Sequence, residues 1–236
     1  SSGVGCYVGL NFVGALAYAD DIVLLAPTPT AMRKLLSICD IYALKYDIIF
    51  NAAKFKFLLV IPGIRKSLPK ILCGTVFYVG GNVIEYVESY VHLGHIITSK
   101  ITDEKDIMQR RNCFVGQVNN VLCFFRKLDM FTKIKLFKSF CTSFFGCELW
   151  ALDDRAIDEF CIAWRKSVRR VLDIPYNSHS FSLPVLSDTL PIFDEICKRS
   201  ARFIVSCLFC PSRLVNSIVW YGFCWDDTIQ LLAEMH

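Results

Sequence analysis

The stretch LAYADDIVLLA, Leu16 to Ala26, places two adjacent aspartates, Asp20 and Asp21, in the middle of an apolar run. Adjacent carboxylates repel each other and are costly to remove from water, so such a pair requires a turn in solvent, a cationic partner or a metal ion. The flanking residues are of the types that favour strands. The pattern therefore predicts a β-hairpin with both aspartates at its tip.

A helix and further strands are predicted around this hairpin. The helix begins with Thr28 as its N-cap and Pro29 at its first position. Short apolar runs separated by glycine turns predict strands over residues 55–61, 76–87 and 89–98. One face of the helix collects apolar side chains, namely Met32, Leu35, Leu36, Cys39, Ala43 and Tyr46. The first hundred residues are thus predicted to be α+β, with an antiparallel sheet.

After Thr98 the apolar residues recur at helical spacing instead. We expect one helix capped by Thr102, a second near residues 132–145 and a third near 154–172. Their predicted apolar faces comprise Ile107, Phe114, Val118, Val121, Leu122 and Phe125; Ile134, Phe137, Cys141 and Phe144; and Ile157, Phe160, Cys161, Trp164, Val168 and Val171. The predicted domains are a sheet segment over 1–98, a helical segment over 99–174, and a linker with a helical tail over 175–236.

Composition narrows the class of protein without deciding it. The chain has 236 residues, is 54% hydrophobic and carries a net charge of +4, which is enough for a core but is only mildly basic. Its twelve cysteines are scattered through apolar stretches, which indicates reduced thiols and an intracellular location, in the nucleus or cytoplasm. The first nineteen residues are uncharged but lack a basic start, so no signal peptide and no membrane partner are predicted.

Basic charge is concentrated in the helical segment. From Lys100 to Lys138 there are nine Lys or Arg against four Asp or Glu. The predicted polar helix faces carry Arg110, Arg111, Lys135, Lys138, Arg169 and Arg170, among other basic residues. Such faces are either simply solvated or contact a polyanion through its phosphates, and three successive basic helices favour the polyanion.

Several motifs in order resemble a known family. Tyr18-Ala19-Asp20-Asp21 resembles the Y-x-D-D motif of reverse transcriptases. FNAAKFK, residues 50–56, resembles the segment that follows the palm helix in LINE-type (non-LTR) reverse transcriptases, with Phe55 in place of a small hydroxyl residue. VHLGHI, residues 91–96, resembles the primer-grip turn. Over roughly residues 6 to 205 the chain is similar to the C-terminal palm and thumb of non-LTR retrotransposon reverse transcriptases.

This resemblance implies an RNA-directed DNA polymerase, a nucleotidyltransferase that uses two Mg²⁺ ions. Asp20 and Asp21 would bind metal, and Lys54 would help to protonate the pyrophosphate leaving group. The residues implied to contact the RNA template, the DNA primer or the dNTP are Tyr18, Leu93, Gly94, Arg110, Arg111, Lys135, Lys138, Arg169 and Arg170.

The family's fingers and first catalytic aspartate precede its Y-x-D-D hairpin, so we expect the chain to be a fragment that needs the missing upstream half. The other sheet acids, Asp47, Glu85 and Glu88, do not match that aspartate, so we expect weak binding of at most one Mg²⁺ ion and no activity alone. Three alternatives remain: a noncatalytic module that grips template-primer duplex, a retroelement remnant without a molecular role, and an unrelated α+β scaffold with a solvated acidic turn.

Overall fold

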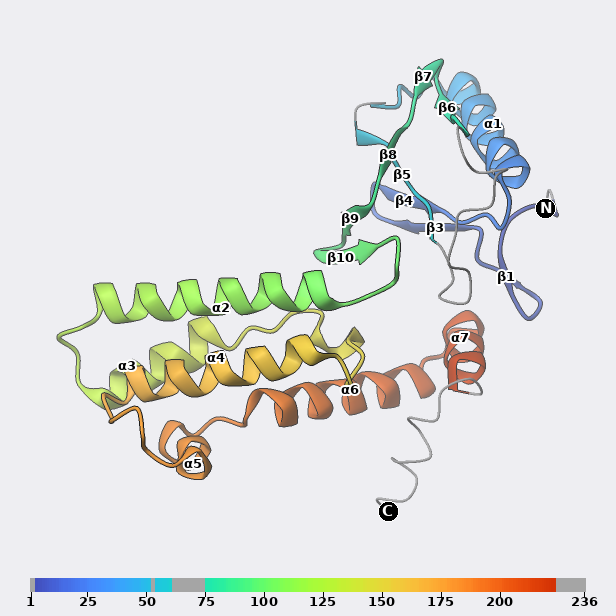
Figure 1. The fold of residues 1–236 in the computed structure, drawn as a ribbon. Helices are drawn as coiled ribbons and strands as arrows, with labels where there is room; N and C mark the ends of the chain where they lie inside the picture. Colours follow the sequence, from blue (N-terminus) through green and yellow to red (C-terminus); the bar gives the residue numbers. More distant parts are fainter. Residues whose placement is uncertain (1–2, 52–53, 61–74, 224–236) are drawn as a thin grey trace. The chain divides into compact units, whose positions relative to one another are not determined.

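The computed structural model describes residues 3–51, 54–60 and 75–223, and contacts between residues divide the chain into two compact units (Figure 1). The sheet unit comprises Ser1–Glu88 and Ile204–His236, and the helical unit comprises Ser89–Phe203. Each unit is described by itself below. Short strands occur together with longer helices, which confirms the predicted mixed α+β class.

The sheet unit contains strands in pairs rather than one broad sheet. The antiparallel pairs are β1 (Tyr7–Val8) with β2 (Asn11–Phe12), β3 (Ala15–Tyr18) with β4 (Asp21–Leu24), and β6 (Tyr78–Val79) with β7 (Asn82–Val83). A further pair, β5 (Lys56–Leu58) with β8 (Glu85–Val87), is parallel. The prediction of an antiparallel sheet is wrong for this pair, because a crossover that includes the β6–β7 hairpin returns the chain in the same direction.

Helix α1 (Pro29–Tyr46) begins as predicted. The Thr28 hydroxyl accepts a hydrogen bond from the Ala31 amide (3.2 Å), and proline at the first position needs no such bond. The helix packs on β6, and its side of the small core consists of Leu35, Leu36 and Ala43. Tyr46 is exposed, so its predicted place on the buried face is wrong: β6 is short and covers only part of the helix.

The C-terminal helix of the sheet unit contacts its first strand. α7 (Arg213–Phe223) packs against β1, and the Asn11 side-chain amide donates a hydrogen bond to the Ser217 hydroxyl (2.9 Å). The two ends of the described chain are therefore joined within one unit.

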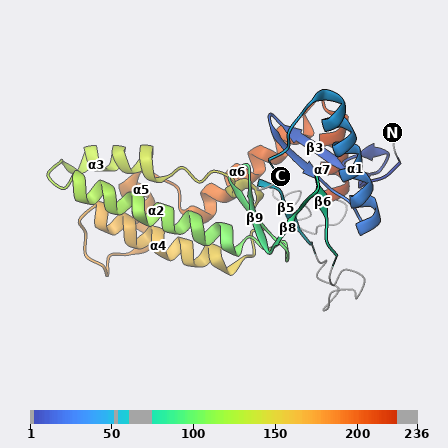
Figure 2. The same ribbon diagram turned by 90° about the horizontal axis from the view of Figure 1, so that it is seen from above.

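The helical unit begins with a β-hairpin and continues as a bundle, in which α2 and α4 lie side by side in both views (Figure 2). Its elements are β9 (Ser89–His92), β10 (His95–Thr98), α2 (Glu104–Phe124), α3 (Met130–Leu136), a π-helical turn (Phe137–Cys141), a 3-10 turn (Cys147–Leu149), α4 (Arg155–Val171), a second 3-10 turn (Ser180–Ser182), α5 (Leu183–Ser187) and the greater part of α6 (Ile192–Leu208). The predicted segment boundaries at 98 and 174 differ from this division, because β10 packs on α2 and α5 packs on α4.

An aromatic cluster forms the core of the bundle. Phe114 lies against Phe137, Phe144 and Phe160 at ring distances of 5.5 to 6.0 Å. The predicted apolar faces of the three helices supply most of this core, although Phe125 is exposed. The prediction that Thr102 caps α2 is wrong. The Thr102 amide donates to the Thr98 hydroxyl (3.0 Å), and the cap position of α2 is Asp103.

None of the helices in the described part of the chain combines the length and apolar composition that a bilayer crossing demands.

Candidate functional site

The aspartate pair lies at a hairpin tip, as the sequence predicts. In the β3–β4 register Tyr18 pairs with Asp21, so Ala19 and Asp20 form the two-residue turn. Tyr18, Asp20 and Asp21 are all exposed. The flanking strands thus hold two carboxylates next to each other in solvent, and carboxylate oxygens are ligands that Mg²⁺ prefers.

The turn between β3 and β4 has a strained backbone. Ala19 has a φ of +52°, in the left-handed region that an L-residue other than glycine, asparagine or aspartate rarely adopts. Such strain is concentrated at functional sites, where the surrounding structure holds the backbone in place. Here the β3–β4 ladder holds it.

The chemistry of the donor set at this tip fits a hard divalent ion, but the set is small. Within the described ranges, no group of three His, Cys, Asp or Glu side chains could hold a metal ion. Asp47 ends α1 through its backbone amide and is exposed, Glu85 forms an ion pair with Lys56, and Glu88 is exposed. If metal binds at the hairpin, Asp20 and Asp21 are the described side chains that would hold it.

Lys54 lies on a single 3-10 turn just before β5. Its amide donates to the Asn51 carbonyl (3.0 Å) and its side chain is exposed, whereas Lys56 is paired with Glu85. Phe55, which departs from the family pattern, lies edge-on to the half-buried Phe50 at 5.5 Å. The substitution thus gives the loop an apolar anchor, and Lys54 stays free of a partner among the described residues. Two further residues of this motif, 52 and 53, lie outside that range.

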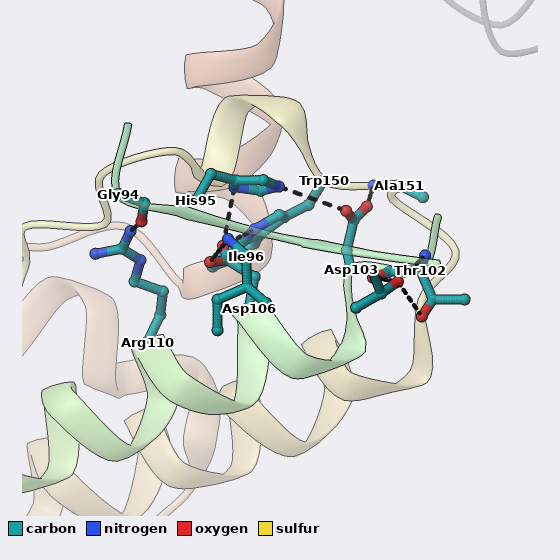
Figure 3. A network of polar contacts seen from close by, with 10 residues as sticks. Gly94, His95, Ile96, Thr102, Asp103, Asp106, Arg110, Trp150 and Ala151 are labelled. Carbon is teal, nitrogen blue, oxygen red and sulfur yellow. Dashed lines mark hydrogen bonds and ion pairs between the residues drawn. The ribbon is translucent and has the colours of Figure 1, made fainter. Parts of the chain in front are cut away.

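Leu93 and Gly94 form a two-residue turn between β9 and β10. Both have positive φ, +48° and +82°, as a type I′ hairpin turn requires. A Cβ atom on Gly94 would lie 3.3 Å from the Phe145 ring, so glycine is also needed for close packing. Arg110 of α2 donates to the Gly94 carbonyl (Figure 3). Its guanidinium carbon lies 5.6 Å from the centre of the Phe145 ring. The turn is therefore held against the bundle.

A buried polar network fastens the rest of this hairpin to the bundle, and no sequence motif pointed to it. The Asp106 carboxylate, 1% exposed, accepts hydrogen bonds from the Ile96 amide (3.0 Å) and the Trp150 indole (2.8 Å) (Figure 3). His95 Nδ1 lies 3.1 Å from the same carboxylate, and His95 Nε2 lies 3.8 Å from Asp103. An acid in the first turn of a helix is typical of a dipole partner, and only the tertiary structure shows Asp106 to be a tether.

The six basic residues predicted to bind nucleic acid differ in their exposure and in their side-chain partners. Lys135, Lys138 and Arg170 are exposed, whereas Arg110, Arg111 and Arg169 are half-buried. Most already have partners: Arg110 binds the Gly94 carbonyl, Arg111 binds Asn112, Arg169 binds the Ser178 carbonyl and the Ser180 hydroxyl, Arg170 binds Asn119, and Lys138 pairs with Asp188. Within the described structure Lys135 has no such partner. Whether these residues face the aspartate hairpin stays a prediction.

Comparison of the sequence with protein-family models finds no match, and comparison with curated proteins finds none. The likeness to reverse transcriptases thus rests on the motifs themselves.

Proposed function

We propose that the chain is the C-terminal palm and thumb of a non-LTR retrotransposon reverse transcriptase, an RNA-directed DNA polymerase. The observation that carries the proposal is the exposed Asp20–Asp21 pair at the tip of a tight hairpin, directly after Tyr18. The Leu93–Gly94 turn, fastened to a basic helical bundle, supports it.

In this proposal each residue has a role that its position allows. Asp20 and Asp21 bind Mg²⁺, which, when bound, supplies the electrostatic stabilisation of the phosphate undergoing nucleotidyl transfer. Lys54 carries the proton that passes to the pyrophosphate leaving group. The Leu93–Gly94 backbone supports the primer end, and basic side chains of the bundle contact template-primer phosphates. The product of this reaction is DNA, which is synthesised from dNTPs on an RNA template.

The sheet unit also exposes apolar side chains that another polypeptide can cover. Leu16 and Tyr18 of β3 and Ile22 of β4 are exposed, as are Ile38 and Ile41 of α1. Large apolar side chains exposed on a short strand pair favour cover by another polypeptide. We propose that the upstream half of the polymerase covers this surface and supplies the family's first catalytic aspartate.

Primer extension on a homopolymer template-primer tests the proposal. We expect no extension by the chain alone at any Mg²⁺ concentration, and extension when a polypeptide with the family's fingers and first aspartate is added. Asp20→Asn or Asp21→Asn should abolish the restored activity, whereas Asp153→Asn, at an exposed acid of the helical unit, should retain it. Synthesis by the chain alone, or restored synthesis that survives Asp20→Asn, would refute the assignment.

A second candidate is a noncatalytic module that binds template-primer duplex. The small donor set at the hairpin, as far as the structure describes it, favours this candidate. It predicts salt-dependent duplex binding that weakens on charge reversal of Lys135 and Arg170, with no extension even after complementation.

A further inference from the structure

The connection between α2 and α3 exposes aromatic and basic side chains together. It runs from Phe124, at the end of α2, to Phe131 in the first turn of α3, at one end of the bundle (Figure 1). Phe124 is 77% exposed and Phe131 is 73% exposed. Between them every residue is exposed, and these residues are Phe125, Arg126, Lys127, Leu128, Asp129 and Met130.

This tip is held in a defined conformation by local hydrogen bonds. The Phe125 amide donates to the Val121 carbonyl (3.0 Å), and the Leu128 amide donates to the Phe125 carbonyl (3.1 Å). The Asp129 carboxylate caps α3, since it accepts hydrogen bonds from the amide (3.0 Å) and the hydroxyl (2.6 Å) of Thr132. The rings are thus exposed on an ordered turn, at little further entropic cost to a ligand.

The charge at the tip indicates the chemistry of the partner. Arg126 and Lys127 have no hydrogen bond or ion pair from their side chains to any described residue, and the nearby acid, Asp129, is engaged by Thr132. Lys133 and Lys135 continue the positive charge along α3. Flat rings that flank unpaired cations match a polyanion with flat faces, which is a nucleic acid with unpaired bases.

We infer that the α2–α3 tip binds single-stranded nucleic acid, with bases stacked on Phe124 and Phe131 and phosphates on Arg126 and Lys127. The inference rests on the proposed function in taking nucleic acid as the polyanion. It adds a site for unpaired nucleotides, built from residues that belong neither to the aspartate hairpin nor to the basic residues assigned to duplex binding.

The test is fluorescence anisotropy of labelled oligothymidylate with the full chain. Phe124→Ala with Phe131→Ala should raise Kd about a hundredfold, about tenfold for each ring. Phe→Leu at both positions keeps apolar surface but not a ring for stacking, and should weaken binding to a similar extent. Phe→Tyr at both should stay within about threefold of the wild type. Phe181→Ala is the matched control, because Phe181 is 81% exposed in the same unit, and it should leave Kd unchanged.

Salt dependence tests the phosphate contacts separately. Arg126→Ser with Lys127→Ser should weaken binding and flatten the plot of log Kd against log salt by about 1.4, because each phosphate that a cation neutralises on a single strand adds about 0.7 to the slope.

Three results would overturn the inference: no binding of oligothymidylate by the wild type, wild-type affinity in the Phe→Leu variant, or a tip whose Phe→Ala variant loses binding to anionic phospholipid vesicles but not to the oligonucleotide. Complementation separates this test from that of the proposed function. If the tip variants bind the oligonucleotide normally and the complemented chain extends primers, only the tip site is refuted. Tip binding without any restored extension refutes only the polymerase assignment.

Discussion

The Asp106 carboxylate is enclosed by polar groups from three other positions of the chain. Two hydrogen-bond donors, the Ile96 amide and the Trp150 indole, and one ring nitrogen of His95 lie within 3.1 Å of its oxygens. A buried carboxylate in this setting stabilises the fold chiefly because its removal leaves the Ile96 amide and the Trp150 indole without an acceptor.

We expect Asp106→Ala to lower the free energy of unfolding by about 3 kcal/mol. Urea denaturation followed by fluorescence measures this. Glu159→Ala, at an exposed acid of α4, is the control and should change the value by less than about 0.5 kcal/mol. Equal effects of the two substitutions would contradict the tether.

Asp188 provides a second prediction at this scale, one that depends on pH. The hydrogen bond from Lys138, and then its charge, lower the pKa of Asp188 below its usual 3.8. A carboxyl whose pKa is lower in the folded state adds stability above its unfolded pKa, and this stability is lost as the pH falls through the folded pKa.

Lys138→Ala should therefore lower stability slightly at neutral pH and have no such effect once the pH is well below 3.8. Stability measured against pH for both proteins checks this. Lys135→Ala, at a neighbouring exposed lysine without a described partner, should produce no pH-dependent difference. A difference that grows with acidity would have the wrong sign for this pair.

The β3–β4 and β9–β10 hairpins reach their tight turns by different means. The β9–β10 turn has glycine at its second position, where packing against Phe145 and a positive φ both require it. The β3–β4 turn instead places alanine at a positive φ, a conformation that costs an L-residue about 1 kcal/mol. The aspartate hairpin therefore contains strain that a substitution can release.

Ala19→Gly should be neutral or raise the free energy of unfolding by up to about 1 kcal/mol, because released strain outweighs the greater freedom of the unfolded chain. Ala17→Gly, in the exposed middle of β3, is the matched control and should be destabilising. If both glycines destabilise the protein equally, Ala19 is not strained. Primer extension by the Ala19→Gly variant, measured after the upstream polypeptide is added, would show whether nucleotidyl transfer needs the strain.

Much of the candidate site could be predicted at the level of single elements. The aspartate hairpin and the Leu93–Gly94 turn follow from alternating apolar residues and turn residues within short windows. The Asp106 network could not be predicted, because its partners come from β10 and from the segment around Trp150, and no local pattern brings these together. The partners that engage Arg169 and Arg170 were missed for the same reason.

At the scale of the whole molecule, the two units have very unequal cores. The helical unit buries a continuous aromatic and aliphatic cluster, including Phe114, Phe160 and Trp164. The buried apolar residues of the described sheet unit are few, namely Val13, Leu35, Leu36, Ala43, Phe77 and Val79. Since stability grows with apolar area removed from water, the sheet unit should be the weaker one.

We expect urea to unfold the chain in two steps, the sheet unit first. Hydrogen exchange followed by mass spectrometry should show that β3 and β4 exchange freely while α2 and α4 remain protected. Leu36→Ala should shift the first step, and Phe160→Ala, which removes a fully buried ring and costs about 3–5 kcal/mol, should shift the second. A single step that both substitutions move equally would mean that the units unfold as one.

The sequence by itself determined the features that depend on neighbours along the chain: the Thr28 cap, the two tight turns, the change from strand to helix period after Thr98, and the apolar faces of α2 and α4. Only the tertiary structure decided the parallel pairing of β5 with β8, the packing of α7 on β1, the exposure of Tyr46 and the burial of Asp106. Turns and helix caps are settled by hydrogen bonds within a few residues. Burial depends instead on which distant element covers a side chain, and that choice is made by the whole fold.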